Sequence, residues 1–123
     1  MKKLLPVIIL ILLLAACKKQ EADPPVVIIL SPAESDSFFI TDSVTLNFTI
    51  SDKNLMSYKI IVSNFSNRKI YYKEEAVAEN NSITIDKKIF FNINADTTAL
   101  INVLGIDKNG NTSGTGVKFK IKQ

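Results

Sequence analysis

Few side chains in this sequence have types and spacings that could do chemistry. The chain has one cysteine, Cys17, and no histidine. Histidine is the commonest general base and metal ligand, so its absence removes the usual activator of a serine or cysteine nucleophile. Glu74 and Glu75 are adjacent. In a strand they would face opposite sides and could not act as a carboxylate pair. The sequence therefore gives no support to an enzyme.

One loop alternates oxygen-bearing side chains around a glycine, and it is the best candidate for a metal site. It is residues 107–111 (DKNGN), and calcium is a hard ion that takes about 6 to 8 oxygen ligands. In a β-sandwich this loop lies at the same end as the turn at residues 52–54. The alternative is a plain hairpin turn, where Asn and Asp tolerate a left-handed backbone. The candidate calcium ligands are Asp52, Asn54, Asp107, Asn109 and Asn111.

Two adjacent tyrosines, Tyr71 and Tyr72, are the candidate binding aromatics. An exposed tyrosine could stack on a sugar or on a partner chain. Adjacent strand residues point to opposite faces, so we expect at most one of the two to point outward. The alternative is a half-buried tyrosine on an edge strand.

Three lysines near the C-terminus, Lys118, Lys120 and Lys122, alternate with apolar residues. They predict a strand with a basic outer face. Such a stripe could contact anionic lipid or glycan. The alternative is that the lysines protect an edge strand from aggregation.

The N-terminus has the three-part layout of an export signal. Lys2 and Lys3 precede an apolar segment at 4–16, which Pro6 interrupts. A membrane-spanning helix needs about 20 residues, so this segment is too short to be one. One interpretation of this layout is an ordinary secretory signal in which the cysteine is incidental.

Residues 14–17 (LAAC) resemble the lipobox of bacterial lipoproteins. The resemblance implies cleavage before Cys17 and acylation, palmitate included, of its sulfur and new α-amine. Two or more acyl chains anchor a protein stably. The residue after Cys17 is Lys18 and not aspartate. In the lipoproteins of enterobacteria, which this stretch resembles, a residue other than aspartate at this position favours sorting to the outer membrane. We therefore expect a lipid-anchored protein of the bacterial cell envelope.

Removal of a signal peptide at residues 1–16 changes the charge of the chain. The full sequence has 15 basic and 12 acidic residues. Without Lys2 and Lys3 the basic residues number 13, which leaves a net charge of +1. Nucleic acid is therefore not an expected partner. Residues 17–25 would form a flexible tether of roughly 30 Å, and residues 26–123 have the length of one domain.

The remainder of the chain predicts an all-β domain. Residues 26–30 are β-branched or leucine, and residues 44–50 alternate apolar and polar side chains. Lys87 breaks the apolar face of segment 83–93, which predicts a bend, a bulge or two short strands. Segment 97–106 is apolar on both faces, so its register stays open. Ala99, Ile101 and Val103 are the expected inward set, and Leu100, Leu104 and Ile106 are the competing set.

About seven short strands with regular turn signals indicate an antiparallel Ig-like or fibronectin-III-like sandwich. Segments 25–32 (PVVIILSP), 44–52 (VTLNFTISD) and 105–111 (GIDKNGN) resemble small bacterial lipoproteins with such a domain. That family is largely uncharacterised. The resemblance implies a non-catalytic binding or assembly module, with envelope proteins or glycans as partners. The alternatives are a purely structural spacer and a weakly calcium-binding, adhesion-type domain.

Overall fold

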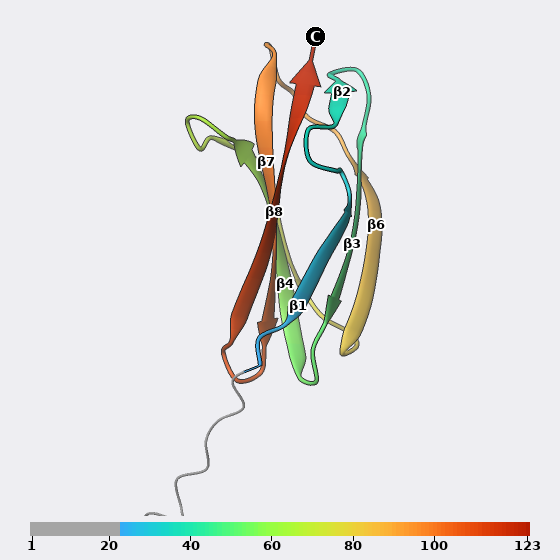
Figure 1. The fold of residues 1–123 in the computed structure, drawn as a ribbon, viewed down its shortest axis with the longest axis vertical. Helices are drawn as coiled ribbons and strands as arrows, with labels where there is room; N and C mark the ends of the chain where they lie inside the picture. The colour runs from blue at the N-terminus through green and yellow to red at the C-terminus, as the bar shows by residue number, and fades with distance from the viewer. Residues whose placement is uncertain (1–22) are drawn as a thin grey trace, which may run out of the picture.

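A computed structural model describes residues 23–123, which form an all-β fold of eight strands (Figure 1). The predicted signal peptide, Cys17 and most of the tether lie outside the described residues. Residues 23–123 contain no helical segment that could span a bilayer. The strands are β1 (Val26–Ser31), β2 (Ser37–Phe39), β3 (Val44–Ser51), β4 (Leu55–Asn64), β5 (Ile70–Val77), β6 (Ser82–Ile89), β7 (Thr97–Asp107) and β8 (Thr112–Lys122).

The strands form two facing sheets, as the sequence predicts. The smaller sheet has the order β1-β3-β6, and the larger has the order β2-β8-β7-β4-β5. All pairs are antiparallel except β2 with β8, which is parallel. The short strand β2 is the element that the sequence pattern did not predict. It comes from the segment around Phe38.

The core lies between the sheets and follows the alternation of the central strands. Four β3 side chains face it, and they are Val44, Leu46, Phe48 and Ile50, all at most 2% exposed. On β7, Ala99, Ile101 and Val103 are buried, so the expected inward set is confirmed.

Leu100 and Leu104 lie on the outer face of β7, and their surroundings explain why this strand is apolar on both sides. A Cβ added to Gly116 would meet Leu100 Cδ1 at 3.5 Å, and one added to Gly114 would meet Leu104 Cγ at 3.4 Å. The two leucines therefore lean over the glycines of neighbouring β8. A leucine can be shielded this way without facing the core.

Strand β6 is continuous from Ser82 to Ile89, contrary to the predicted interruption at Lys87. Its register with β3 runs unbroken, and Lys87 pairs with Leu46. Lys87 keeps the inward parity of its apolar neighbours because it has a partner between the sheets, as described below.

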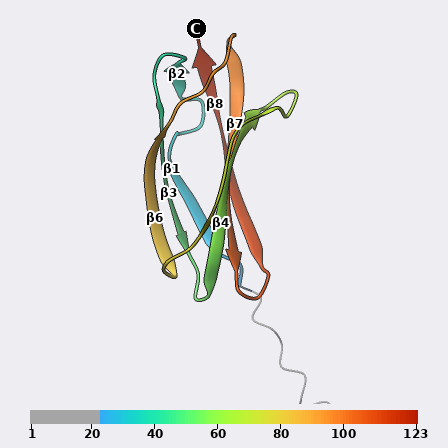
Figure 2. The same ribbon diagram turned by 180° about the vertical axis from the view of Figure 1, so that it is seen from behind.

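The chain enters the sandwich at one pole and ends at the other. Near the entry lie the β3–β4 and β7–β8 turns, whereas the C-terminus lies at the far pole (Figures 1 and 2). Pro25, at the entry, is fully buried. A Cβ added to Gly105 would come within 2.9 Å of both Pro25 Cβ and Ile50 Cγ2. Gly105 is therefore needed for the proline to pack.

We expect the Gly105→Ala substitution to lower the free energy of unfolding by about 1–3 kcal/mol, because the added methyl overpacks this site. Gly114→Ala is the matched control on the next strand, since its Cβ would make ordinary contact with a flexible leucine. Urea denaturation of both variants measures the difference. Equal stabilities for the two variants would contradict the packing of Pro25 against β7.

Candidate functional site

The loop predicted to bind calcium is built around the carboxylate of Asp107. Oδ1 accepts hydrogen bonds from the backbone N–H groups of Asn109 (2.9 Å) and Asn111 (2.8 Å). Oδ2 accepts one from the side-chain amide of Asn111 (2.9 Å). Gly110 has a φ of 84°, so the loop uses the left-handed conformation that glycine permits. Both carboxylate oxygens of Asp107 thus stabilise the turn.

The environment of Asp107 keeps its carboxylate ionised. Burial by itself would raise the pKa. Hydrogen bonds from the Asn111 side chain and from the backbone of Asn111, Asn109 and Gly110 outweigh this effect and hold the pKa of Asp107 below its usual range.

The structure brings the two loops of the candidate calcium site together. The backbone N–H of Lys108 donates to the carbonyl of Asn54 at 2.8 Å. Asp52 Oδ2 accepts a hydrogen bond from the Asn54 backbone N–H at 2.9 Å, so this carboxylate also serves its own turn. Among residues 23–123, no three acidic side chains gather into a group that could hold a metal ion. Calcium binding at this pole stays a prediction.

Tyr71 and Tyr72 both pack against the core, although they are adjacent in a strand. Val62 pairs with Tyr72 and Ser63 pairs with Ile70, so a bulge lies at Tyr71. The Tyr71 hydroxyl accepts a hydrogen bond from Asn64 Nδ2 at 2.9 Å. A bulge breaks the alternation of faces, and both rings therefore turn inward. The structure places neither tyrosine on the outer face where a binding partner would first meet it.

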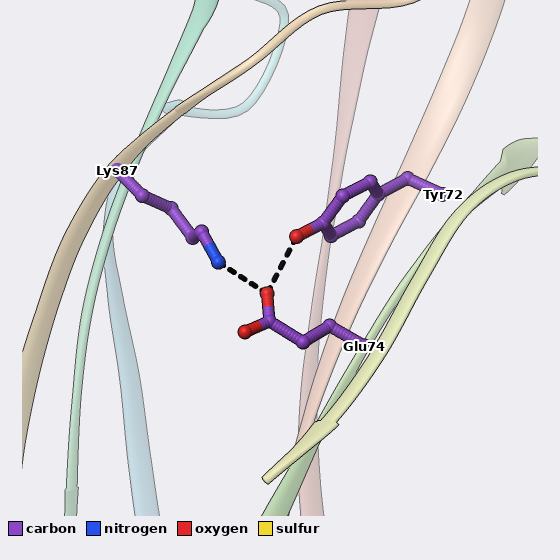
Figure 3. Close-up of polar contacts among 3 residues, drawn as sticks. All are labelled: Tyr72, Glu74 and Lys87. Atoms are coloured by element: carbon purple, nitrogen blue, oxygen red, sulfur yellow. Dashed lines mark hydrogen bonds and ion pairs between the residues drawn. The ribbon is translucent and has the colours of Figure 1, made fainter.

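A polar cluster of Tyr72, Glu74 and Lys87 bridges the two sheets. Tyr72 and Glu74 both belong to β5, and Lys87 belongs to β6. Figure 3 shows Lys87 and Tyr72 contacting the same oxygen of Glu74. The Tyr72 hydroxyl donates to Glu74 Oε2 at 2.5 Å, and Lys87 forms an ion pair with that oxygen. The side chains of Lys87 and Glu74 are 30% and 29% exposed. The cluster joins β5, an edge strand of the larger sheet, to β6, an edge strand of the smaller sheet.

The cluster holds its groups in the states that they have in neutral water. Hydrogen bonds from Lys87 and Tyr72 lower the pKa of Glu74. The hydrogen bond to Glu74 raises the pKa of Lys87. Burial, followed by the hydrogen bond to Glu74, raises the pKa of Tyr72. A general acid or base works best with a pKa near the operating pH, and these shifts go the other way. The arrangement is suited to joining the sheets.

The pattern of any single strand does not reveal this cluster, because its members lie on two strands of different sheets. Lys87 has the same parity as Ile83, Ile85 and Ile89. On β5, Glu74 lies on the same face of the strand as Tyr72, and both residues pair with core residues of β4. Two opposite charges at inward positions on separate strands are the signal that could have suggested an ion pair between sheets.

We expect the Glu74→Gln substitution to lower the free energy of unfolding by about 1 kcal/mol at neutral pH, between the values for exposed and buried pairs. The lowered pKa of Glu74 means that its contribution is present above the ordinary value of 4.5 and is lost as the pH falls through the lowered value. The variant should therefore show a flatter loss of stability below about pH 5. Denaturation at a series of pH values measures this.

Glu75→Gln is the control for this experiment. Glu75 pairs with Lys59 (3.0 Å) and Lys73 (3.5 Å), but its side chain is 59% exposed. Solvent screens such pairs, so a smaller change is expected. A pH profile for Glu74→Gln that matches the original protein would show that the cluster does not stabilise the fold.

Comparisons with known proteins establish the fold. No protein-family profile matches the sequence, and neither does any curated protein. Among solved structures, the fibronectin(III)-like modules of Clostridium thermocellum CbhA are similar, with a TM-score of 0.52 and 14% sequence identity. The match covers 79% of this chain and 96% of that chain. The chain therefore has a fibronectin-III-like β-sandwich fold.

Proposed function

We propose that this protein is a non-catalytic, lipid-anchored module of the bacterial cell envelope that binds a partner protein or glycan through the pole far from its anchor. The observation that carries the proposal is the position of three exposed aromatic side chains. Phe39, Phe65 and Phe90 are 58%, 39% and 74% exposed. All three belong to the far pole (Figure 1). Phe39 is the last residue of β2, and Phe65 and Phe90 directly follow β4 and β6.

Exposed aromatic residues are typical of protein interfaces, where they supply the largest contributions to binding. Pro25, the last tether residue, packs at the opposite pole. With an acylated Cys17, the tether would hold the entry pole toward the lipid and leave the phenylalanines facing away. The Lys18 that follows Cys17 supports an outer-membrane position under the sorting rule described above.

The polar groups of the sandwich support a binding role better than a catalytic one. The carboxylates of Asp107 and Glu74 are held ionised by hydrogen bonds within the fold. Both are used by the structure, one in a turn and one between the sheets. The fibronectin-III-like fold agrees with a binding or structural module, since such sandwiches present their loops to partners.

Cross-linking in native membranes followed by affinity purification tests the proposal. The far-pole variant carries Phe39→Ser, Phe65→Ser and Phe90→Ser together. The matched control replaces exposed apolar residues near the entry pole, Met56→Ser and Val77→Ser, which are 44% and 78% exposed. We expect a stoichiometric partner with the original and control proteins and its loss with the far-pole variant. Absence of any partner in all three would favour a structural spacer instead.

A further inference from the structure

A strongly basic surface lies at the far pole, on the outer face of the larger sheet. Lys118, Lys120 and Lys122 point outward from β8, because the intervening Phe119 and Ile121 are 1% and 2% exposed in the core. The β4–β5 turn adds Phe65 and Arg68 beside them. We call these five residues the basic patch: Phe65, Arg68, Lys118, Lys120 and Lys122.

The lysines of the patch are not needed to protect a sheet edge. The edge of β8 is already covered by backbone hydrogen bonds to the segment around β2. The Ser35 N–H donates to the Lys118 carbonyl at 2.9 Å, and the Lys120 N–H donates to the Asp36 carbonyl at 2.7 Å. The Ile40 N–H donates to the Lys122 carbonyl at 2.7 Å. An edge covered in this way cannot pair with another strand, so the three lysines require another explanation.

Within the described chain, the cations of the patch lack the ion pairs that other lysines on this face form. Elsewhere on this face, Lys59 and Lys73 pair with Glu75. Across residues 23–123, the four cations of the patch form no ion pair. The neighbouring carboxylates bind backbone instead. Glu34 accepts from the Lys118 N–H at 3.1 Å, and Asp96 accepts from the Gln123 N–H at 2.9 Å.

Phe65 holds two of these cations in position. Its ring centroid lies 4.8 Å from Lys118 Nζ and 5.7 Å from Arg68 Cζ, within the range of cation–π interactions. The turn that carries Phe65 is itself fixed, because the Phe65 N–H donates to the Thr98 carbonyl at 2.9 Å. The ring therefore orders the Lys118 ammonium and the Arg68 guanidinium, which can both donate hydrogen bonds to a carboxylate. Such preorganisation lowers the entropic cost of binding.

We propose that the basic patch binds an extended acidic segment of a partner protein, with carboxylates at every second residue. The inference rests on the proposed function and names the chemistry of its partner. Alternate residues of a strand lie about 7 Å apart, and an extended peptide has the same spacing. The three lysines of β8 would thus face three successive carboxylates. The C-terminal end of β8 and the β4–β5 turn, which carry the patch, lie toward the pole opposite the chain entry (Figure 1), which favours a partner away from the anchoring lipid.

Binding of a synthetic peptide that alternates aspartate and serine tests this inference, using the mature protein extracted from membranes into detergent. We expect saturable binding that weakens as salt is added. The Lys118→Gln, Lys120→Gln and Lys122→Gln triple variant should bind at least about tenfold more weakly, because it loses three charge pairs. A control with the same change in charge, Lys53→Gln, Lys88→Gln and Lys108→Gln, should retain most of the binding.

Phe65→Leu gives a second test, since it keeps every charge and removes only the ring that orders two of them. We expect weaker binding than the original protein and stronger binding than the triple lysine variant. Unfolding curves confirm that each variant is folded.

Three results would overturn the inference. These are equal affinities for the two triple variants, equal binding of a peptide whose aspartates form one block, or binding to anionic vesicles but not to the alternating peptide. If the far pole still captures its partner while the peptide fails to bind, the inference fails and the proposed function stands. If the peptide binds but no native partner is captured, the proposed function fails instead.

Discussion

Replacing Cys17 with serine is expected to abolish fatty-acid incorporation into the protein completely. Serine has no thiol to form the thioether through which lipoproteins carry their lipid. The resemblance of residues 14–17 to a lipobox implies acylation at Cys17, and each buried methylene of an acyl chain contributes about 0.8 kcal/mol to membrane binding. Metabolic labelling with an alkyne fatty acid, in a bacterium that processes lipoproteins, measures the effect.

Lys18→Asp is the matched control for this experiment. It changes the residue after the cysteine but leaves the thiol in place, so labelling should be retained. Under the sorting rule, the same variant should shift from the outer to the inner membrane. Fatty-acid labelling that persists in the Cys17→Ser variant would contradict acylation at this residue.

Replacing Phe48 with alanine is expected to lower the free energy of unfolding by about 3–5 kcal/mol, the usual cost of removing a large core ring. Phe48 is 0% exposed. Its ring packs edge-on against Tyr58, with centroids 5.8 Å apart and an interplanar angle of 66°. The chain has a single cysteine, so no disulfide within it can offset the loss. Small domains have total stabilities of about 5–15 kcal/mol.

Phe90→Ala is the control, because the Phe90 side chain is 74% exposed. Its effect should stay within about 0.5 kcal/mol, as for most surface substitutions. Urea denaturation followed by circular dichroism compares the two variants. A loss below about 1 kcal/mol for Phe48→Ala would show that the β3 face is not the centre of the core.

The sequence was informative wherever one strand could be interpreted by itself. The strict alternation of segment 44–50 predicted β3 and its four core side chains, because a half-buried strand exposes every second residue. The expected inward set of β7 was also right. The ambiguity there came from Leu100 and Leu104, which lie over Gly116 and Gly114 on the outer face.

The sequence was less informative wherever a residue depends on a neighbouring strand. Lys87 suggested a break in β6 because nothing within that strand explains a charged side chain on its apolar face. Its partner, Glu74, lies on an edge strand of the other sheet. Tyr71 and Tyr72 both face inward because of a bulge against β4, which a two-residue period cannot show. Strand β2 depends on its parallel pairing with β8, and three residues are too few to give a pattern.

The most direct test of a lipid-anchored module is intact mass spectrometry of the mature protein extracted from membranes. Lipid anchoring predicts a chain that begins at Cys17 and carries acyl groups on its sulfur and α-amine. A mature chain with an unmodified Cys17 thiol, or one cut at another position and released in soluble form, would contradict it.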